Sequence, residues 1–455
     1  MFIGREKELE ELREQLKTSK KTAVLVYGKR RIGKSTLISE AARSFQGIVI
    51  DFECVKSTYA GNMVLLSKNI SDTLDLPVLQ FAGLMDIFSF LGTRKEQILV
   101  ILDEYQYLKE TSRKNEIDSY MQSVIDHLPE NVKVILCGSY VTVMKELLEE
   151  GNPLFGRFTS IIHLQEMNYL TASHFFPEEN VQKKLEIYAV FGGSPYVLSV
   201  IQPDQSIAWN IQKFLLPSTG TLRTYIENVM LKEIQKAYDI RILEIIGNGR
   251  KKYSDINTAL GGNDSGLLDK QLKNLLNMET IQKEFPINKP NGRQKQFYSI
   301  SDNLMRFYFA YVFGNSSSLS FLGPEMYYKE KISPSVLEFI SRRFEDIARQ
   351  YFSIQAHAGK RTGILDVGTF WYDDPVHRKS GEFDCVLKRE KEYDFYECKY
   401  FTKPMKKEQC DEEAKQIHQI SAVLHPHTIG FVCSSGFAFD TDEYELITGN
   451  DLFTE

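Results

Sequence analysis

Hydrophobic residues in the first third of the chain follow two different spacings. Five short apolar runs predict β-strands at 22–27, 48–53, 98–102, 133–137 and 160–164. Between them, apolar residues recur every three or four positions, as at Leu9, Leu12 and Leu16, which predicts amphipathic helices. Strands that alternate with helices favour a parallel sheet covered by helices on both faces. We therefore expect an α/β domain at the N-terminus.

The pattern changes further along the chain. Strand signals fade and helical spacing dominates, which predicts a helical lid. Next come two helical patterns and a hairpin pattern, the outline of a winged helix. A short run of glycine and serine predicts a linker. The last part begins as a helix and continues as several strand-like runs. The predicted segments are 1–165 (ATPase core), 166–235 (lid), 236–313 (winged helix), 314–334 (linker) and 335–455 (C-terminal α/β domain).

Composition narrows the class of protein. A chain of 455 residues, 42% hydrophobic and 25% charged, is expected to fold into about two to four domains. The net charge of −6 argues against a general nucleic-acid coat, although it leaves room for a local basic face. No apolar run is long enough to span a membrane, and the charged N-terminus has no signal-peptide core. The six cysteines form no Cys-x-x-Cys pair, which favours a reducing cytoplasm over disulfides or a zinc site.

A glycine-rich motif after the first predicted strand indicates a phosphate-binding loop. Backbone N–H groups of such a loop surround phosphate oxygens, and the start of the following helix adds a partial positive charge. Lys34 is expected to reach the terminal phosphates, and the Ser35 hydroxyl to ligate Mg²⁺. The candidate binding residues are Gly28, Lys29, Arg30, Arg31, Ile32, Gly33, Lys34, Ser35 and Thr36.

Polar residues near two other predicted strands supply candidates for hydrolysis. Asp103 and Glu104 end an apolar strand, where Asp103 would hold Mg²⁺ and Glu104 would polarise the attacking water. Ser139 ends the next strand and would sense the γ-phosphate, or alternatively cap the following helix. Arg157 would offset charge on the transferred phosphoryl group, or else be an ordinary surface arginine.

Several short motifs together carry a family resemblance. They are Gly4-Arg5-Glu6, the phosphate loop, Asp103-Glu104-Tyr105-Gln106, Cys137-Gly138-Ser139, Gly156-Arg157 and Gly193-Ser194-Pro195. Over roughly residues 1–320 the chain resembles the archaeal-type ATPase family, in the STAND branch of AAA+ P-loop NTPases. The resemblance implies that Gly4 and Arg5 lie near the nucleotide base, and that Gly193 and Pro195 close over it from the lid. It also implies ATP and ADP as ligands and a conformational switch. No second-region arginine of ring-forming relatives is present, which disfavours ring assembly.

A second group of charged residues lies near the C-terminus. Two strand patterns carry Asp384 on one strand and Glu397 and Lys399 on the other. Residues two apart on a strand share a face, so two carboxylates and a lysine are expected to converge on Mg²⁺. A hairpin with a solvated charged face is the alternative. The arrangement resembles the PD-(D/E)xK nuclease fold, which implies Glu345 as a further acid and Gln416 as a contributor.

The predicted fold is an α/β P-loop NTPase sheet with a helical lid, a winged helix and a C-terminal α/β restriction-endonuclease-like domain. The predicted activity is ATP hydrolysis with Mg²⁺, in a switch whose C-terminal parts bind DNA or cut it as an endonuclease. The alternative is a regulatory or signalling ATPase with an inactive tail that serves as a binding module. Candidate DNA contacts in the winged-helix segment are Lys270, Lys273, Lys289, Arg293 and Lys295.

Overall fold

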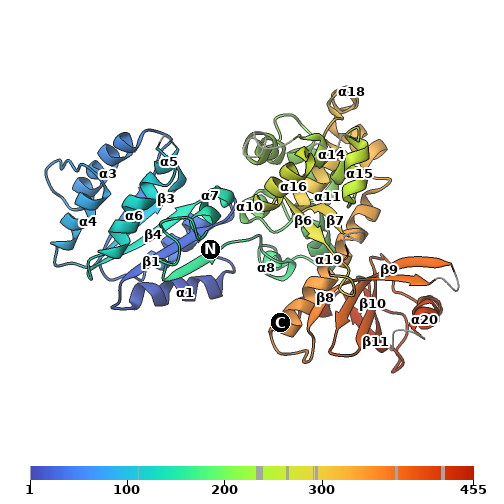
Figure 1. Ribbon diagram of the computed structural model, residues 1–455. Coiled ribbons are helices and arrows are strands. Elements are labelled where there is room, and N and C mark those ends of the chain that lie inside the picture. The colour runs from blue at the N-terminus through green and yellow to red at the C-terminus, as the bar shows by residue number, and fades with distance from the viewer. Residues whose placement is uncertain are drawn as a thin grey trace. The chain divides into compact units, whose positions relative to one another are not determined.

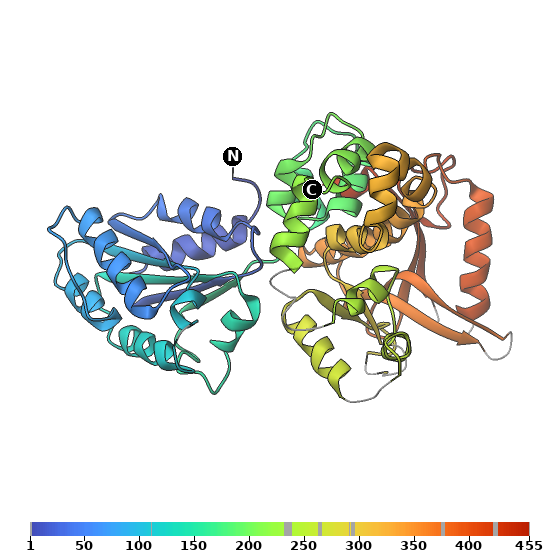
Figure 2. The same ribbon diagram turned by 90° about the horizontal axis from the view of Figure 1, so that it is seen from above.

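The chain divides into two compact units, Met1–Glu166 and Met167–Glu455, each with its own five-stranded sheet (Figures 1 and 2). The computed structural model describes residues 2–110, 112–231, 239–262, 266–290, 292, 296–374, 378–421 and 426–454. Arg293 and Lys295, two of the candidate DNA contacts, lie outside these ranges. No helix within them is both long and apolar enough to cross a membrane.

The first unit is built on a parallel sheet of strand order β2-β3-β4-β1-β5. Its strands are β1 (Thr22–Tyr27), β2 (Ile48–Glu53), β3 (Ile98–Asp103), β4 (Val132–Gly138) and β5 (Ser160–His163). The five strands predicted from apolar runs are confirmed to within one residue at each end. The runs predicted them well because β1, β3 and β4 are buried on both faces and therefore carry almost no polar positions.

Helices cover both faces of this sheet. One face packs against α1 (Glu6–Lys17) and α2 (Lys34–Ala42). The other face packs against α3 (Tyr59–Thr73), α4 (Leu84–Gly92), α5 (Gln106–Lys109), α6 (Glu116–Asp126) and α7 (Val141–Glu146). Along β3, Leu99 and Ile101 face α1 and α2, whereas the alternate residues Ile98, Val100 and Leu102 face the other layer. Asp103 continues the alternation of Leu99 and Ile101, so its side chain lies on the α2 side of the sheet.

The second unit begins with helices packed into one large core. Its first helices are α8 (Tyr169–Ser173), α9 (Val181–Phe191), α10 (Pro195–Val200), α11 (Ile207–Asn210), α12 (Thr221–Tyr225) and the π-helical turns Ile211–Leu215 and Ile226–Met230. Next come α14 (Arg241–Gly247), α15 (Tyr253–Ala259), α16 (Leu267–Asn277) and the antiparallel hairpin of β6 (Ile281–Glu284) and β7 (Phe297–Ile300). Three helices rather than two thus precede the hairpin within the described residues, and the winged helix stays a prediction.

Most of the segment predicted as a linker is helical instead, with a break at Gly323. After α17 (Asn303–Tyr311), the chain forms α18 (Ser316–Tyr327) and a π-helical turn at Tyr328–Ile332. Leu319, Tyr327 and Ile332 are buried in the large core. The glycine and serine signal at its start was therefore wrong for the segment as a whole, because burial of these apolar side chains decides its structure.

A mixed sheet, of strand order β12-β11-β10-β9-β8, ends the chain. Its strands are β8 (Asp366–Asp374), β9 (Lys379–Lys388), β10 (Tyr393–Lys399), β11 (Pro426–Cys433) and β12 (Glu445–Thr448). The first three are antiparallel, and β10, β11 and β12 are parallel. The long helix α19 (Val336–His357) packs on one face and α20 (Lys407–Ser421) on the other. A short 3-10 turn follows at Asp451–Phe453.

Candidate functional sites

The glycine-rich loop connects β1 to α2 at the carboxyl edge of the first sheet. Gly28 directly follows β1, and a Cβ there would overlap the carbonyl oxygen of Leu164 at the end of β5. Gly33 has φ 96° and caps α2, and residues with a Cβ rarely adopt this backbone conformation. Both glycines are therefore required by the backbone path of the loop.

Lys34 lies against the loop that precedes it. Its Nζ donates hydrogen bonds to the carbonyl oxygens of Gly28, at 3.0 Å, and Lys29, at 2.9 Å. The side chain is buried, so its ammonium is fixed at the loop rather than extended into solvent. A cation held beside the N-terminus of α2 creates a positive environment suited to phosphate.

Ser35 and Asp103, predicted to serve one Mg²⁺ ion, are in direct contact. The Ser35 Oγ donates to Asp103 Oδ2 at 2.8 Å, and Asp103 Oδ1 accepts the backbone N–H of Glu104 at 2.8 Å. A hydroxyl and a carboxylate are hard oxygen ligands of the kind that Mg²⁺ prefers. This donor pair therefore suits the metal that the sequence predicts.

Glu104 is held by two side chains. Its Oε2 accepts a hydrogen bond from Ser139 Oγ at 2.6 Å and another from Gln106 Nε2. Gln106 Nε2 also donates to Ser139 Oγ at 3.3 Å. Glu104 has φ 52°, which is uncommon for a residue with a side chain and often marks a functional position. Ser139 and Glu104 thus meet at the ends of two strands, a contact that the sequence did not predict, and Gln106 joins them.

Arg30 connects the loop to this group. Its Nε donates to Ser139 Oγ at 3.4 Å and its Nη2 to the Tyr107 hydroxyl at 2.6 Å. The guanidinium also lies over the ring of Tyr140, 5.4 Å from its centroid. Loop and candidate catalytic side chains therefore form one connected network.

Arg157 lies elsewhere, which corrects its predicted role. It precedes β5 and pairs through Nε with Asp126, at the end of α6, at 3.0 Å. Because β5 runs parallel to β1, a residue before β5 lies at the amino edge of the sheet, whereas the phosphate loop lies at the carboxyl edge. Arg157 is a partly exposed arginine in an ion pair, the alternative that spacing had left open.

The remaining nucleotide-site candidates have structural partners of their own. Arg5 has φ 68° and caps α1, and it donates to Glu8 Oε1 at 3.3 Å and to the carbonyl oxygen of Gln165. Gly193 belongs to the second unit, where its carbonyl accepts the Met167 N–H at 3.0 Å and a Cβ would overlap the Met167 backbone. The roles of Gly4, Arg5, Gly193 and Pro195 in nucleotide binding stay predictions.

In the second unit, a β-bulge carries Asp384. Two residues of β9, Asp384 and Cys385, face the single residue Thr369 of β8. Bulges change the direction of a side chain and are frequent beside functional sites. The Asp384 carbonyl accepts a hydrogen bond from Arg349 of α19, which fixes the bulge to that helix.

Lys399 joins two glutamates on the α20 side of the sheet. Its Nζ lies 2.7 Å from Glu397 Oε1 and 2.9 Å from Glu413 Oε1. Glu397 and Lys399 share a face as predicted, and Glu413 of α20 is an additional partner. Gln416, the other candidate on α20, donates instead to the Tyr372 hydroxyl at 3.0 Å.

The three predicted acids influence one another but form no ready metal site. Burial and then the nearby Asp384 carboxylate raise the pKa of Glu345 to about 8 and that of Glu397 to about 7. Burial also raises the pKa of Asp384. Within the described ranges, however, no group of three or more His, Cys, Asp or Glu side chains is arranged to hold a metal ion. The predicted metal set of Glu345, Asp384 and Glu397 is therefore not preformed.

Comparison with known proteins finds a family similarity in two parts of the chain. Residues 2–201 match a family model described as an ATPase domain predominantly from Archaea. This stretch of the chain is thus similar to the ATPase domains of that family. Residues 308–416 match a second family model, of archaeal and bacterial proteins of unknown function.

Two relatives and one solved structure are similar to this chain. The chain is 27% identical over 379 residues to an uncharacterized protein of Methanocaldococcus jannaschii, covering 82% of each. It is 25% identical over 199 residues to an uncharacterized ATP-binding protein of Pyrococcus horikoshii, covering 43% of this chain and 59% of the relative. A solved Walker-type ATPase of Pyrococcus abyssi superposes with a TM-score of 0.51 at 20% identity, covering 68% of this chain and 96% of that one. This likeness shows the fold of a P-loop ATPase.

Proposed function

We propose that the first unit binds and hydrolyses ATP as a switch of the STAND branch of AAA+ NTPases. The observation that carries the proposal is the meeting of Lys34, Ser35, Asp103, Glu104 and Ser139 at one edge of the sheet. Lys34 and Ser35 begin α2 after the loop that follows β1, and the other three lie at the ends of β3 and β4. A phosphate loop, a pair of metal-binding oxygens and a carboxylate to orient water are the parts that phosphoryl transfer to water requires.

The residues have separate roles in this proposal. Ser35 and Asp103 would hold Mg²⁺, which neutralises charge on the phosphates when bound. Lys34 binds the terminal phosphates, and Glu104 accepts a proton from the attacking water. Ser139 and Gln106 hold the Glu104 carboxylate in this structure. A γ-phosphate that accepts a hydrogen bond from the Ser139 hydroxyl would break the contact between Ser139 and Glu104.

Replacement of Glu104 by Gln tests the proposal. We expect Glu104→Gln to bind ATP like the wild type and to hydrolyse it roughly 10²- to 10⁴-fold more slowly, since a positioned general base contributes about that factor. Glu110→Gln is a matched control, because Glu110 lies nearby but pairs with Lys56 at the surface. Unchanged hydrolysis in Glu104→Gln, measured as phosphate release, would refute the assignment.

For the second unit we propose a nuclease-like fold that binds DNA. The element order α19-β8-β9-β10-α20-β11 and the bulge at Asp384 support a PD-(D/E)xK-like domain. The lack of a preformed metal group within the described residues favours binding over cleavage. The exposed lysines Lys270 and Lys273 of α16 are candidate phosphate contacts in a winged helix.

Two assays separate binding from cleavage. Plasmid, linear and single-stranded DNA are incubated with Mg²⁺ or Mn²⁺, for wild type and Lys399→Ala. We expect intact DNA in all cases, together with DNA binding that weakens steeply as salt rises. Cleavage by wild type that Lys399→Ala abolishes would instead establish a metal-dependent endonuclease. A DNA affinity that does not change with salt concentration would contradict binding through the DNA phosphates.

The alternative is a regulatory or signalling ATPase whose inactive tail is a protein or nucleic-acid binding module. If that module binds protein, it differs in one measurable respect: DNA should leave the ATPase rate unchanged. If the second unit is a DNA-binding partner of the switch, saturating DNA should change the rate of phosphate release by wild type. The Glu104→Gln variant provides the background rate.

A further inference from the structure

A pocket of about 620 Å³ lies in the second unit, beside α19. Its walls come from the loop after α14, the β6–β7 hairpin, α17 and α19. Five arginines line it: Arg250, Arg306, Arg342, Arg343 and Arg349. Pockets of this size bind small molecules and cofactors. The chemistry of the wall therefore indicates what this one can accept.

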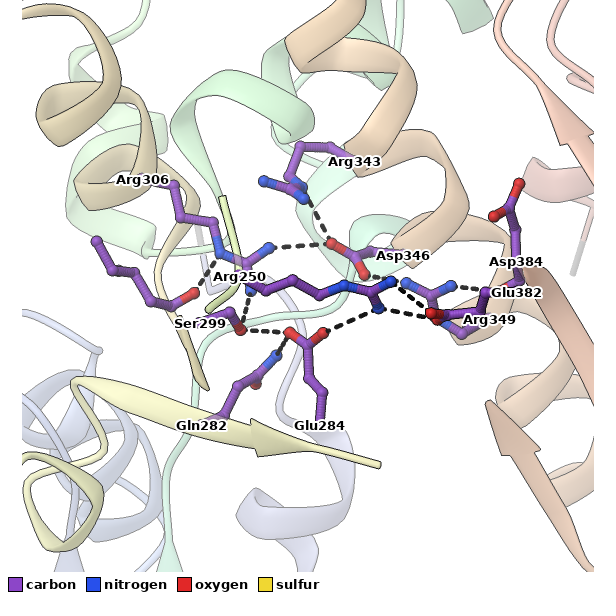
Figure 3. A network of polar contacts seen from close by, with 11 residues as sticks. Arg250, Gln282, Glu284, Ser299, Arg306, Arg343, Asp346, Arg349, Glu382 and Asp384 are labelled. Carbon is purple, nitrogen blue, oxygen red and sulfur yellow. Dashed lines mark hydrogen bonds and ion pairs between the residues drawn. The ribbon is translucent and has the colours of Figure 1, made fainter. Parts of the chain in front are cut away.

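Around Asp346, the arginines outnumber the carboxylates that pair with them. Asp346 alone receives three guanidinium groups: Arg306 at 3.0 Å, Arg343 at 3.1 Å and Arg349 (Figure 3). Arg250 pairs with two carboxylates, Glu284 at 3.7 Å and Glu382 of β9. One carboxylate offers two oxygens, whereas each guanidinium carries five N–H donors. The cluster around Asp346 thus has donors to spare.

Arg343 and Arg342 are the pocket arginines that we consider for binding a ligand, because each pairs with a carboxylate through one nitrogen. Arg343 is mostly buried and uses only its Nε toward Asp346; among the described residues its two Nη groups have no protein acceptor. Arg342 lies next to it at the exposed rim, paired with Glu338 one turn away. Guanidinium groups placed in this way suit bidentate binding of phosphate.

The rest of the wall narrows the class of anion. Tyr311 and Phe339 line the pocket with their rings 5.9 Å apart, and Arg343 lies over the Phe339 ring. Glu338 and Glu345 also line it. Carboxylates repel a bare phosphate but accept hydrogen bonds from hydroxyl and amino groups, and aromatic rings stack on bases. A nucleotide combines the phosphate, the donors and the base that this wall can bind.

We propose that this pocket binds a nucleoside monophosphate unit, supplied either as a free nucleotide or as the 5′-phosphorylated end of a DNA strand. The proposal deepens the DNA-binding role of the second unit and rests on it for the choice of ligand. It is independent of ATP hydrolysis in the first unit, because every residue in the pocket lies beyond Met167.

Binding is measured on the full chain carrying Lys34→Ala, in EDTA, so that the phosphate loop contributes little. The probes are thymidine 5′-monophosphate and a thymidine dodecamer with a 5′-phosphate or a 5′-hydroxyl. We expect Arg343→Ala and Arg342→Glu each to weaken binding roughly tenfold or more, as expected for lost hydrogen bonds to a charged group. Arg241→Ala is the matched control, since Arg241 is an exposed arginine paired with Asp239.

The outcomes distinguish the source of the ligand and the two proposals. Binding of the monophosphate identifies a free nucleotide, and binding of the dodecamer only with its 5′-phosphate identifies a strand end. Arg342→Glu remains informative if Arg343→Ala does not fold, because Arg342 is exposed. The pocket proposal fails if no probe binds, or if both pocket variants bind like Arg241→Ala. If DNA binds in a salt-dependent way but the pocket variants leave it unchanged, the pocket fails while the DNA-binding role stands. If only the monophosphate binds, the pocket proposal stands while the DNA-binding role fails.

Discussion

Asp346 is the residue whose loss should most destabilise the second unit. It lies on α19 and receives the guanidinium groups of Arg306, Arg343 and Arg349. Burial alone would raise the pKa of Asp346, but these three arginines hold it well below its usual range. Asp346→Asn keeps the shape of the side chain and removes the charge. Three largely buried cations would then face one neutral amide.

The magnitude follows from exposure and partner number. Removing one partner of a buried ion pair costs about 3 to 5 kcal/mol. Asp346 is 28% exposed, so we take the lower end, about 3 kcal/mol. Asp239 is also 28% exposed, but among the described residues it pairs with Arg241 alone, which is itself well exposed. For such a surface pair, Asp239→Asn should cost at most about 1 kcal/mol.

Tryptophan fluorescence during urea unfolding measures this difference. Both tryptophans of the chain, Trp209 and Trp371, lie in the second unit, so the signal reports on that unit alone. The pKa of Asp346 is lower in the folded chain than in the unfolded one. Its stabilisation is therefore complete above the ordinary pKa of Asp, about 3.9, and is lost as pH falls through the folded value. Equal effects of Asp346→Asn and Asp239→Asn at pH 7 would refute the reasoning.

Two further predictions concern the other sites. Gly28→Ala should abolish ATP binding by calorimetry, because the new Cβ would overlap the Leu164 carbonyl; normal affinity would contradict the required backbone path. The pKa of Glu345 is raised to about 8 and that of Glu397 to about 7, so the folded unit holds protons that the unfolded chain releases above about pH 4.3. The tryptophan-monitored free energy of unfolding should therefore fall between about pH 5 and pH 8, and Glu345→Gln should lessen that fall; an equal fall in both proteins would contradict it.

The sequence predicted the first sheet well because its information is local. Each strand is an apolar run between turn signals, and burial on both faces leaves little ambiguity. The segment at 314–334 failed for the opposite reason. Gly314 and the serines after it are a local loop signal, whereas the helix depends on Leu319 and Tyr327 packing against distant residues. The local sequence pattern cannot predict this packing against residues far away in the chain.

The candidate sites show the same division. The contact between Ser35 and Asp103 follows from two strands ending at one edge, and the sequence contains both ends. Glu413 could not be found, since its position beside Lys399 depends on how α20 packs on the sheet. Arg157 was misplaced although a signal existed: a residue before a parallel strand lies at the edge opposite to the phosphate loop.

Helix α19 connects the two chemical features of the second unit. Its apolar stripe, which includes Phe344 and Ile347, is buried in the large core. Its charged side carries Arg343 toward the pocket and Glu345 toward both the pocket and Asp384. Arg343 and Glu345 lie within one turn of a helix that packing holds rigid. A ligand phosphate bound by Arg343 would therefore alter the electrostatic environment of Glu345 without any rearrangement of the backbone. For this reason, the pH dependence of unfolding should be measured with and without thymidine 5′-monophosphate. The difference between the two curves is the effect of a bound phosphate, and the curve without ligand is the effect of the carboxylates themselves.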